Sequence, residues 1–404
     1  MQYSTFAAID IGSYDVILEI FEISKKQGIR SVDKICHRME LGKDTYTLGK
    51  IRPEMEEELC RVLADFVRIM EGYRVDDYRA TASSAISEAS NSLYVLGKIH
   101  QLTGLSVTVL SNSEQRFLSY KALAAMEDNF NKIIEKGTAI LDLDGGSFQI
   151  SLFDKDALVT TQNIRMGSLR IRERLAGIQS ETEHYEEMVE ELIWNEVSSF
   201  KKMYLKDRKI ENIMLIGDVF TDSVYQNIEE KTTKIISREN FNTWYEKIIR
   251  QSPMELAVKL GIPLENASLM YPSAVIYKCL IDMMGAEHIW IPGVHMTRGI
   301  AYEYAEQMKL LKGGHNFEND ILMAAKNIGK RYAVNRPHVQ NLEMTALAMF
   351  DATKKMHGMK ERERLLLQMA VMLHDVGKYI SFNNVADSSY NIIMSNAVSY
   401  THLT

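Results

Sequence analysis

The N-terminal part of the chain begins with short apolar runs that are bounded by glycine and polar residues, as is typical of β-strands. Further on, in "IRPEMEEELCRVLADFVRIMEGY", apolar residues recur every three to four positions, which is typical of an amphipathic helix. These patterns predict strands near residues 5–12, 14–24, 29–41, 76–82 and 105–111, with helices over 51–73 and 84–104. Strands that alternate with helices favour an α/β layered architecture.

The middle of the chain repeats this organisation. Strands are predicted near 138–143, 148–154, 157–163 and 212–217, with a helix from about 181 to 203. The stretch "LKGGHNFENDI", residues 311–321, combines glycines with polar residues and is interpreted as a linker. Beyond it the pattern is wholly helical. We therefore predict two related α/β domains, 1–132 and 133–310, followed by an all-α domain, 319–404.

Composition narrows the class of protein. A chain of 404 residues is long enough for two or three domains, and its formal net charge of -7 argues against general nucleic-acid binding. The three cysteines lie far apart with no CxxC pair, which suits a reducing compartment. The N-terminus lacks a basic and apolar leader, and no apolar run reaches 18 residues. We expect a cytoplasmic protein that does not span a membrane.

Two turns in the α/β part share an unusual composition. "AAIDIGSYDVILEI" (7–20) contains Asp10, Gly12 and Ser13. "ILDLDGGSFQISLF" (140–153) likewise has aspartate before glycine and serine, with two aspartates, two glycines and one serine. Glycines allow an anion to approach backbone N–H groups, serine adds a donor, and aspartate can hold a divalent cation. An ordinary β-hairpin explains either turn alone. The matched pair favours a phosphate site between two domains.

These turns resemble the two phosphate-binding motifs of the exopolyphosphatase and guanosine pentaphosphate phosphatase (Ppx/GppA) family. "TASSAISEASNS" and "VTVLSNSEQRFLSYKAL" resemble further family segments, and "RMGSLRIRERL" follows at the expected distance. The resemblance covers nearly the whole chain. It implies two actin-like (ribonuclease H-like) domains flanking a cleft, Mg²⁺, and hydrolysis of a terminal phosphoanhydride in polyphosphate or pppGpp. It also implies a homodimer.

Carried over position by position, the resemblance implies two groups of site residues. Phosphate would be bound by Gly12, Ser13, Tyr14, Ser87, Gly145, Gly146 and Ser147, and Mg²⁺ by Asp10, Asp142 and Asp144.

The sequence departs from the family where the chemistry is expected. Where the family has the glutamate that serves as base, this chain has Gln115. Where the family has the glutamate that closes the second motif, this chain has Gln149. An amide cannot take a proton from water near neutral pH, so Glu114 would have to act as a shifted base. Tyr14 replaces an asparagine, Ser87 replaces an arginine, and Asp144 replaces a glycine. Together these changes predict slowed or lost turnover.

The C-terminal helices resemble an HD domain, in which a histidine from one helix and a His-Asp pair from another can ligate a metal. His338 follows Pro337, and His374 and Asp375 lie in "LHDVGKYI". The alternative is that these residues only pack in the core. A further histidine expected downstream falls on Ser388, and the final "AVSYTHLT" continues no recognisable helix. We expect an HD-type domain that is incomplete at its C-terminus and serves packing or dimerisation.

Three hypotheses remain open. The first is a Mg²⁺-dependent phosphohydrolase acting on polyphosphate or pppGpp, between which the sequence does not choose. The second is a binding module that senses polyphosphate or guanosine tetra- and pentaphosphate without hydrolysing it. The third, an actin-like ATPase or kinase, has less support, because the late turn "LIGDVF" lacks the glycines that cradle adenosine.

Overall fold

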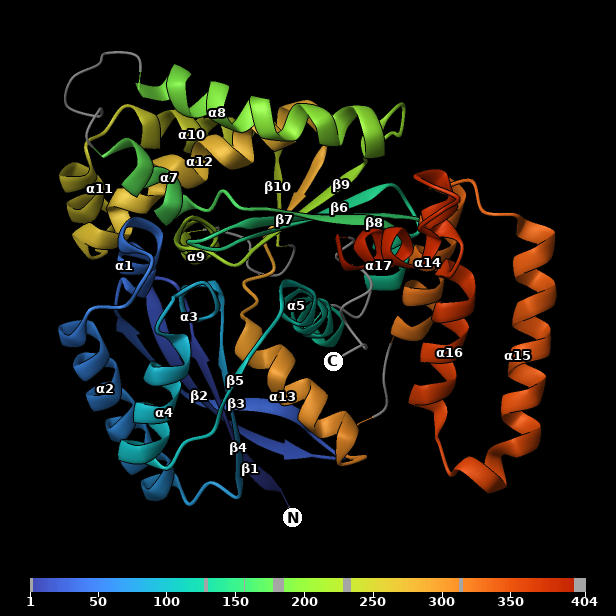
Figure 1. Cartoon of the computed structure of the whole chain (residues 1–404). Coiled ribbons are helices and arrows are strands. Elements are labelled where there is room, and N and C mark those ends of the chain that lie inside the picture. The colour runs from blue at the N-terminus through green and yellow to red at the C-terminus, as the bar shows by residue number, and fades with distance from the viewer. Residues whose placement is uncertain are drawn as a thin grey trace.

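Two mixed β-sheets of the same topology form the centre of the molecule (Figure 1). The computed structural model describes residues 3–126, 130–155, 157–176, 185–227, 234–311 and 315–395. The first sheet has the order β3-β2-β1-β4-β5 and the second β10-β11-β9-β6-β7-β8. In each, an antiparallel three-stranded meander continues into two parallel strands. We call each sheet with its helices a lobe. The repeat confirms the two related α/β domains predicted from the strand and helix pattern, and it agrees with the actin-like fold that the family resemblance implies.

The first lobe has its apolar core on the face covered by α2 and α4. In α2, Pro53 occupies the first turn, and Leu59, Leu63 and Phe66 are buried at helical spacing. The elements are β1 (Ser4–Ile11), β2 (Asp15–Ser24), β3 (Gly28–Arg38), α1 (Leu41–Leu48), α2 (Pro53–Tyr73), β4 (Asp77–Ala82), α3 (Ser84–Ser87), α4 (Ser92–Thr103), β5 (Val107–Val109), α5 (Asn112–Met126) and α6 (Phe130–Ile134).

The second lobe buries the largest core between its sheet and a layer of helices that includes α7, α8 and α12. The elements along this part of the chain are β6 (Thr138–Leu143), β7 (Phe148–Asp154), β8 (Ala157–Ile164), α7 (Ser168–Leu175), α8 (Tyr185–Phe200), a π-helical turn (Lys201–Leu205), β9 (Asn212–Ile216), α9 (Val219–Asn227), β10 (Ile235–Ser237), α10 (Arg238–Ile249), α11 (Pro253–Leu260), α12 (Leu264–Met284) and β11 (His288–Trp290). They are followed by α13 (Met296–Gln307), which packs on the first sheet.

The helical region lies beside the second sheet and confirms the all-α prediction (Figure 1). It comprises α14 (Phe317–Arg331), α15 (Arg336–His357), α16 (Glu361–Leu373), a 3₁₀ turn (Val376–Tyr379) and α17 (Val385–Ser395). Ile328 of α14 and Leu373 of α16 share a core with Ile140 of β6. The predicted incomplete end, 397–404, lies outside the described residues.

Some predicted elements have different bounds. The strand expected to reach 41 ends at Arg38, and α1 follows because the Gly42 N–H donates to the Ser13 carbonyl, which docks α1 on the first turn. The helix expected over 84–104 is broken into α3 and α4, because the Asn91 side chain bonds both backbone groups of Ile51. The expected linker 311–321 is too long, since Asn316 caps α14 by accepting the Asn319 N–H.

The helix α13 packs on the first sheet, although the boundary predicted at 310 assigns it to the second domain. Tyr304 stacks on Phe6 with ring centroids 4.1 Å apart, and Ile300 and Ala301 are buried in the same core as Phe21. In Figure 1, α13 runs along the first sheet with α5 beside it, on the face opposite α2 and α4. Within the described ranges, no helix combines the length and the apolar character needed to cross a membrane.

Candidate active site

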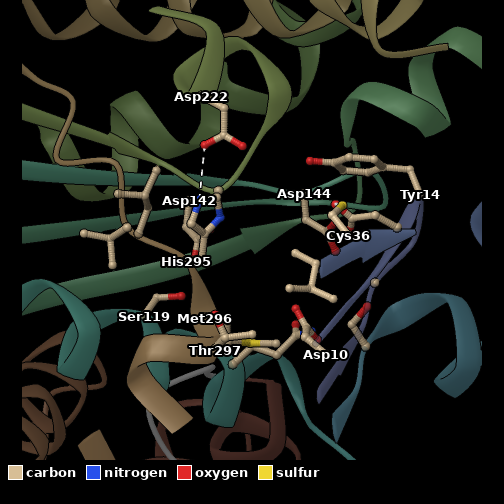
Figure 2. A pocket seen from close by; sticks show the side chains of 18 of the residues that line it. Asp10, Tyr14, Cys36, Ser119, Asp142, Asp144, Asp222, His295, Met296 and Thr297 are labelled. Carbon is tan, nitrogen blue, oxygen red and sulfur yellow. Dashed lines mark hydrogen bonds and ion pairs between the residues drawn. The ribbon is translucent and has the colours of Figure 1, made fainter. Parts of the chain in front are cut away.

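The two predicted turns open onto one cavity of about 270 Å³ between the lobes. The first turn contributes Asp10, Gly12 and Tyr14, and the second contributes Asp142, Asp144, Ser147 and Gln149. Figure 2 shows Asp10, Asp142 and Asp144 around this cavity. The structure therefore brings together residues that are more than a hundred positions apart in the sequence.

The two turns are built alike, which explains why their side chains reach the same place. In the first, the Gly12 N–H donates to the Asp15 carbonyl at 2.9 Å, and in the second, the Asp144 N–H donates to the Ser147 carbonyl at 2.9 Å. Each turn thus closes a hairpin, and the two hairpin turns lie at corresponding ends of their sheets. Across the second hairpin Gln149 pairs with Asp142, so its amide lies beside that carboxylate.

The three predicted metal ligands are crowded acids. Burial raises the pKa of Asp10 well above its ordinary value, and the charges of Asp15 and Asp144 raise it further. Burial also raises the pKa of Asp142 to about 6 and that of Asp144 to about 7. Asp10 Oδ1 is buried and has no hydrogen-bond partner among the described residues. In the part of the chain that the structure describes, Arg116 is the one cation that lowers the pKa of any of the three, that of Asp142. Such a crowded oxygen set fits a hard divalent cation such as Mg²⁺.

Not every predicted site residue reaches the cavity. Gln115 of α5 lines it, whereas Glu114 is not among the lining residues. The Glu114 carboxylate accepts the N–H and the hydroxyl of Ser111, both at 2.8 Å, and so caps α5. This geometry argues against Glu114 as a shifted base. Ser87 lines a separate cavity of about 490 Å³ with Arg165, away from the acids.

Three predicted phosphate contacts are covered by the first lobe. The fully buried Ser13 shares hydrogen bonds with Tyr46 Oη (2.8 Å) and Ser84 Oγ (3.3 Å). A Cβ added to Gly146 would lie 2.1 Å from Tyr46 Oη, so only glycine fits there. Ser13, Gly145 and Gly146 do not line the cavity. A phosphate contact at Gly146 requires that Tyr46 move.

The strand β3 contributes positively charged residues to the cavity, and these were not predicted from the sequence. Lys34, Cys36 and Arg38 occupy alternate positions of this strand and all line the cavity. Arg38 pairs with Asp15 at 2.8 Å, and its guanidinium lies 5.6 Å from the centre of the Tyr14 ring. The sequence signal is that residues 34, 36 and 38 of "KICHR" alternate, so that on a strand their side chains face the same side. Lys34 and Arg38 therefore bring positive charge to the lining of the cavity.

A histidine and an aspartate, also unpredicted, complete the cavity. His295 immediately precedes α13, and Asp222 lies on α9. Their Nε2 and Oδ1 atoms are 3.5 Å apart (Figure 2). No sequence motif marks this pair, because the fold brings it together from elements far apart in the chain.

Ion pairs tie the lobes together beside the cavity. Arg170 of α7 donates to both carboxylate oxygens of Glu88 at 3.0 and 3.1 Å and to the Gly146 carbonyl at 2.9 Å. The Arg172 guanidinium likewise donates to both carboxylate oxygens of Glu40, at 2.7 and 2.8 Å. Relative movement of the lobes would therefore change the second turn.

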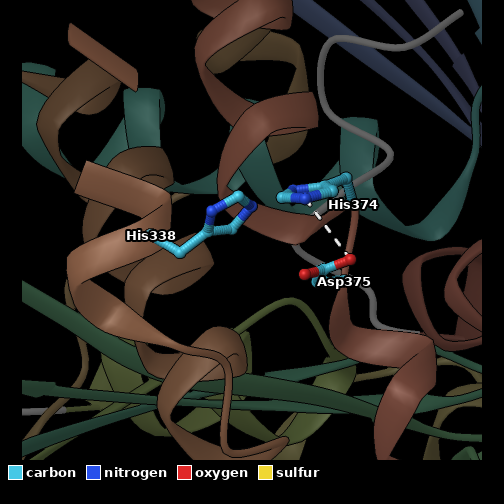
Figure 3. Close-up of side chains that lie close together, drawn as sticks. All are labelled: His338, His374 and Asp375. Atoms are coloured by element: carbon cyan, nitrogen blue, oxygen red, sulfur yellow. Dashed lines mark ion pairs between the residues drawn. The ribbon is translucent and has the colours of Figure 1, made fainter. Parts of the chain in front are cut away.

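In the helical region, His338, His374 and Asp375 gather their ligand atoms within 4.8 Å of one another (Figure 3). His374 Nδ1 lies 2.8 Å from the Val371 carbonyl, so a hydrogen there leaves Nε2 free for a metal. That nitrogen is 3.3 Å from Asp375 Oδ1. Ser389, next to the position of the expected further histidine, donates to the His374 carbonyl and supports packing.

Two lobes of one topology around a carboxylate-lined cavity define an actin-like protein. The chain belongs to the Ppx/GppA phosphatase family, whose model matches residues 20–308. Residues 322–399 match domain III of the Ppx/GppA phosphatases.

Curated relatives cover different shares of the chain. A bifunctional 3-dehydroquinate synthase/phosphatase of Fusobacterium nucleatum is 21% identical over 310 residues, 70% of this chain. The match spans only 44% of that relative's length. A guanosine-5'-triphosphate,3'-diphosphate pyrophosphatase of Vibrio atlanticus is 19% identical over 397 residues, which are 96% of this chain and 76% of the relative.

Solved structures support the fold. The Ppx/GppA family member of Aquifex aeolicus matches with a TM-score of 0.62 at 18% identity, covering 76% of this chain and 99% of that one. An exopolyphosphatase of Cytophaga hutchinsonii matches with a TM-score of 0.68 at 17% identity, covering 75% and 98%.

Proposed function

We propose that the protein hydrolyses the terminal phosphoanhydride bond of inorganic polyphosphate or of pppGpp and releases orthophosphate. One observation carries this proposal: paired turns from the two lobes bring Asp10, Asp142 and Asp144 to one cavity. The names of the relatives, a guanosine pyrophosphatase and an exopolyphosphatase, support the two substrates.

Mg²⁺ would be held by Asp10, Asp142 and Asp144, and when bound it supplies positive charge to the phosphate oxygens. The raised pKa values of these acids support this assignment, because burial disfavours their charged forms and, among the described side chains, only Asp142 has a nearby cation, Arg116. Asp144, which replaces a family glycine, thus adds a ligand oxygen.

The chain's own residues would bind and orient the substrate. Lys34 and Arg38 bring positive charge to the phosphates, and the N-terminus of α13, where Met296 and Thr297 line the cavity, favours an anion. Gln115 can hold the attacking water by hydrogen bonds but cannot accept its proton.

A phosphate-release assay tests the proposal. Wild type with Mg²⁺ should release orthophosphate from polyphosphate or pppGpp, and Asp142→Ala should lose at least about 100-fold in rate. Asp207→Ala, which removes an exposed carboxylate from the same lobe, is the matched control and should keep wild-type activity. Release from neither substrate above a protein-free blank contradicts the proposal.

A second candidate is a non-hydrolytic sensor of polyphosphate or guanosine tetra- and pentaphosphate. It is favoured by Gln115 and Gln149, which line the cavity where the family resemblance places glutamates. Binding by calorimetry without turnover would support it. Phosphate release that appears only in the Gln115→Glu, Gln149→Glu double variant would show a disabled hydrolase.

A further inference from the structure

His295 faces the proposed active site from the junction of the lobes. It lines the cavity together with Gln115 and the three acids, and its side chain keeps 27% of its surface exposed. Asp222, which also lines the cavity, has its Oδ1 3.5 Å from Nε2 (Figure 2). An imidazole oriented by a carboxylate and open to a substrate cavity is the arrangement that proton transfer requires.

Other groups that line the cavity are poorly suited to take a proton from water. Gln115 is an amide, and Asp15 is engaged with Arg38 at 2.8 Å. Burial raises the pKa of the Cys36 thiol to about 11, so it stays protonated near neutral pH. Asp10, Asp142 and Asp144 are the oxygens proposed to hold the cation.

The surroundings of His295, in contrast, favour its neutral form. Burial lowers its pKa below the ordinary 6.5, and Lys34 on β3 acts in the same direction. The negative charges that oppose this are Asp222 on α9 and Glu19 and Asp15 on β2. The N-terminus of α13, which His295 precedes, also disfavours an imidazolium. A neutral imidazole with Nε2–H toward Asp222 keeps a lone pair on Nδ1.

We propose that His295, oriented by Asp222, is the general base that replaces the glutamate missing at position 115. This inference rests on the proposed hydrolase function. The water oxygen bonds to the terminal phosphorus while one water proton passes to the imidazole. The bridging P–O bond breaks, and its electron pair leaves with the oxygen of the shortened chain. The imidazolium then returns its proton to solvent.

Steady-state kinetics with polyphosphate and saturating Mg²⁺ test the role of His295. His295→Gln should lower kcat by about 10²–10⁴-fold with little change in KM. His37→Gln is the matched control, because His37 lies on β3 with its ring on Glu58 and does not line the cavity. Adding Gln115→Glu to His295→Gln should restore part of the lost kcat. Thermal unfolding shows whether each variant is folded.

The pH profile of kcat shows whether Asp222 orients His295 or has only a structural role. Because the neutral imidazole is the active form, wild-type kcat should fall as pH drops through the pKa of His295, below 6.5. Asp222→Asn removes a charge that raises this pKa, so the acid limb should move to lower pH. At saturating Mg²⁺, which would keep Asp142 and Asp144 ionised, that limb should be absent in His295→Gln.

The possible outcomes distinguish failure of the His295 base assignment from failure of the proposed hydrolase function. Release by wild type that persists at the same rate in folded His295→Gln overturns the base assignment and leaves the hydrolase standing. An unchanged acid limb in Asp222→Asn overturns the role of Asp222. No release by wild type from polyphosphate or pppGpp contradicts both the function and the inference.

Discussion

Asp218 is a buried acid directly behind the cavity, and its ionisation should weaken the fold. Only 2% of the residue is exposed, and Oδ1 accepts the Thr221 N–H at 3.0 Å and the Tyr277 hydroxyl at 3.2 Å. Burial raises its pKa from 3.8 to about 7. The folded protein therefore keeps a proton that the unfolded chain has already released.

The sign of the effect follows from that proton. The stabilising contribution is fully present below about pH 4 and is lost as pH rises to about 7. Between pH 5 and pH 8 this group alone should cost about 3 kcal/mol of unfolding free energy. Asp218→Asn stays neutral and keeps the Oδ1 acceptor, so it should escape that loss.

Urea unfolding of wild type and Asp218→Asn at both pH values measures the difference. The variant's advantage in unfolding free energy should grow by about 3 kcal/mol from pH 5 to pH 8. Asp207→Asn, an exposed acid in the same lobe, should show no such growth. Parallel pH dependence in wild type and Asp218→Asn would refute the reasoning.

Three further predictions concern the lobe contact and the helical region. Gly146→Ala should cost about 1–3 kcal/mol of unfolding free energy and lower phosphate release, whereas Gly97→Ala, with open space around it, should gain about 0.5–1 kcal/mol. A double-mutant cycle of Arg172→Ala with Glu40→Ala should give a coupling energy of about 1–2 kcal/mol. His374→Ala should weaken Zn²⁺ binding to the full chain by more than about tenfold, as measured by calorimetry.

Each of these has a contrary result. Equal stability of the two alanine variants would show that Tyr46 leaves Gly146 room. A coupling energy near zero would mean that the lobes are not tied by that pair. Zn²⁺ binding that is unchanged in His374→Ala would mean that the gathered ligands pack without holding a metal.

Local pattern predicted the hairpins well, because Asp10 and Asp142 each end an apolar run before a glycine turn. The convergence of the two turns could be predicted because the same pattern occurs twice. Neither turn alone indicates it. The cap made by Glu114 was also readable, since Ser111-x-x-Glu is a capping pattern. The family resemblance drew attention to catalysis at this position instead.

Other features depend on tertiary structure and left no local trace. His295 and Asp222 meet only because α9 and α13 both begin at the junction of the lobes. Tyr46 covers Gly146 because α1 docks between the lobes, and helical propensity says nothing about that position. The packing of α13 on the first sheet likewise reflects a chain that returns across the lobes.

The central claim is that turns from opposite lobes hold the same metal and phosphate. Calorimetric titration of polyphosphate into wild type, Asp10→Asn and Asp142→Asn, with and without Mg²⁺, tests it most directly. The account predicts Mg²⁺-dependent binding in wild type and its loss in each single variant. Binding that keeps its Mg²⁺ dependence in either variant would contradict a shared site.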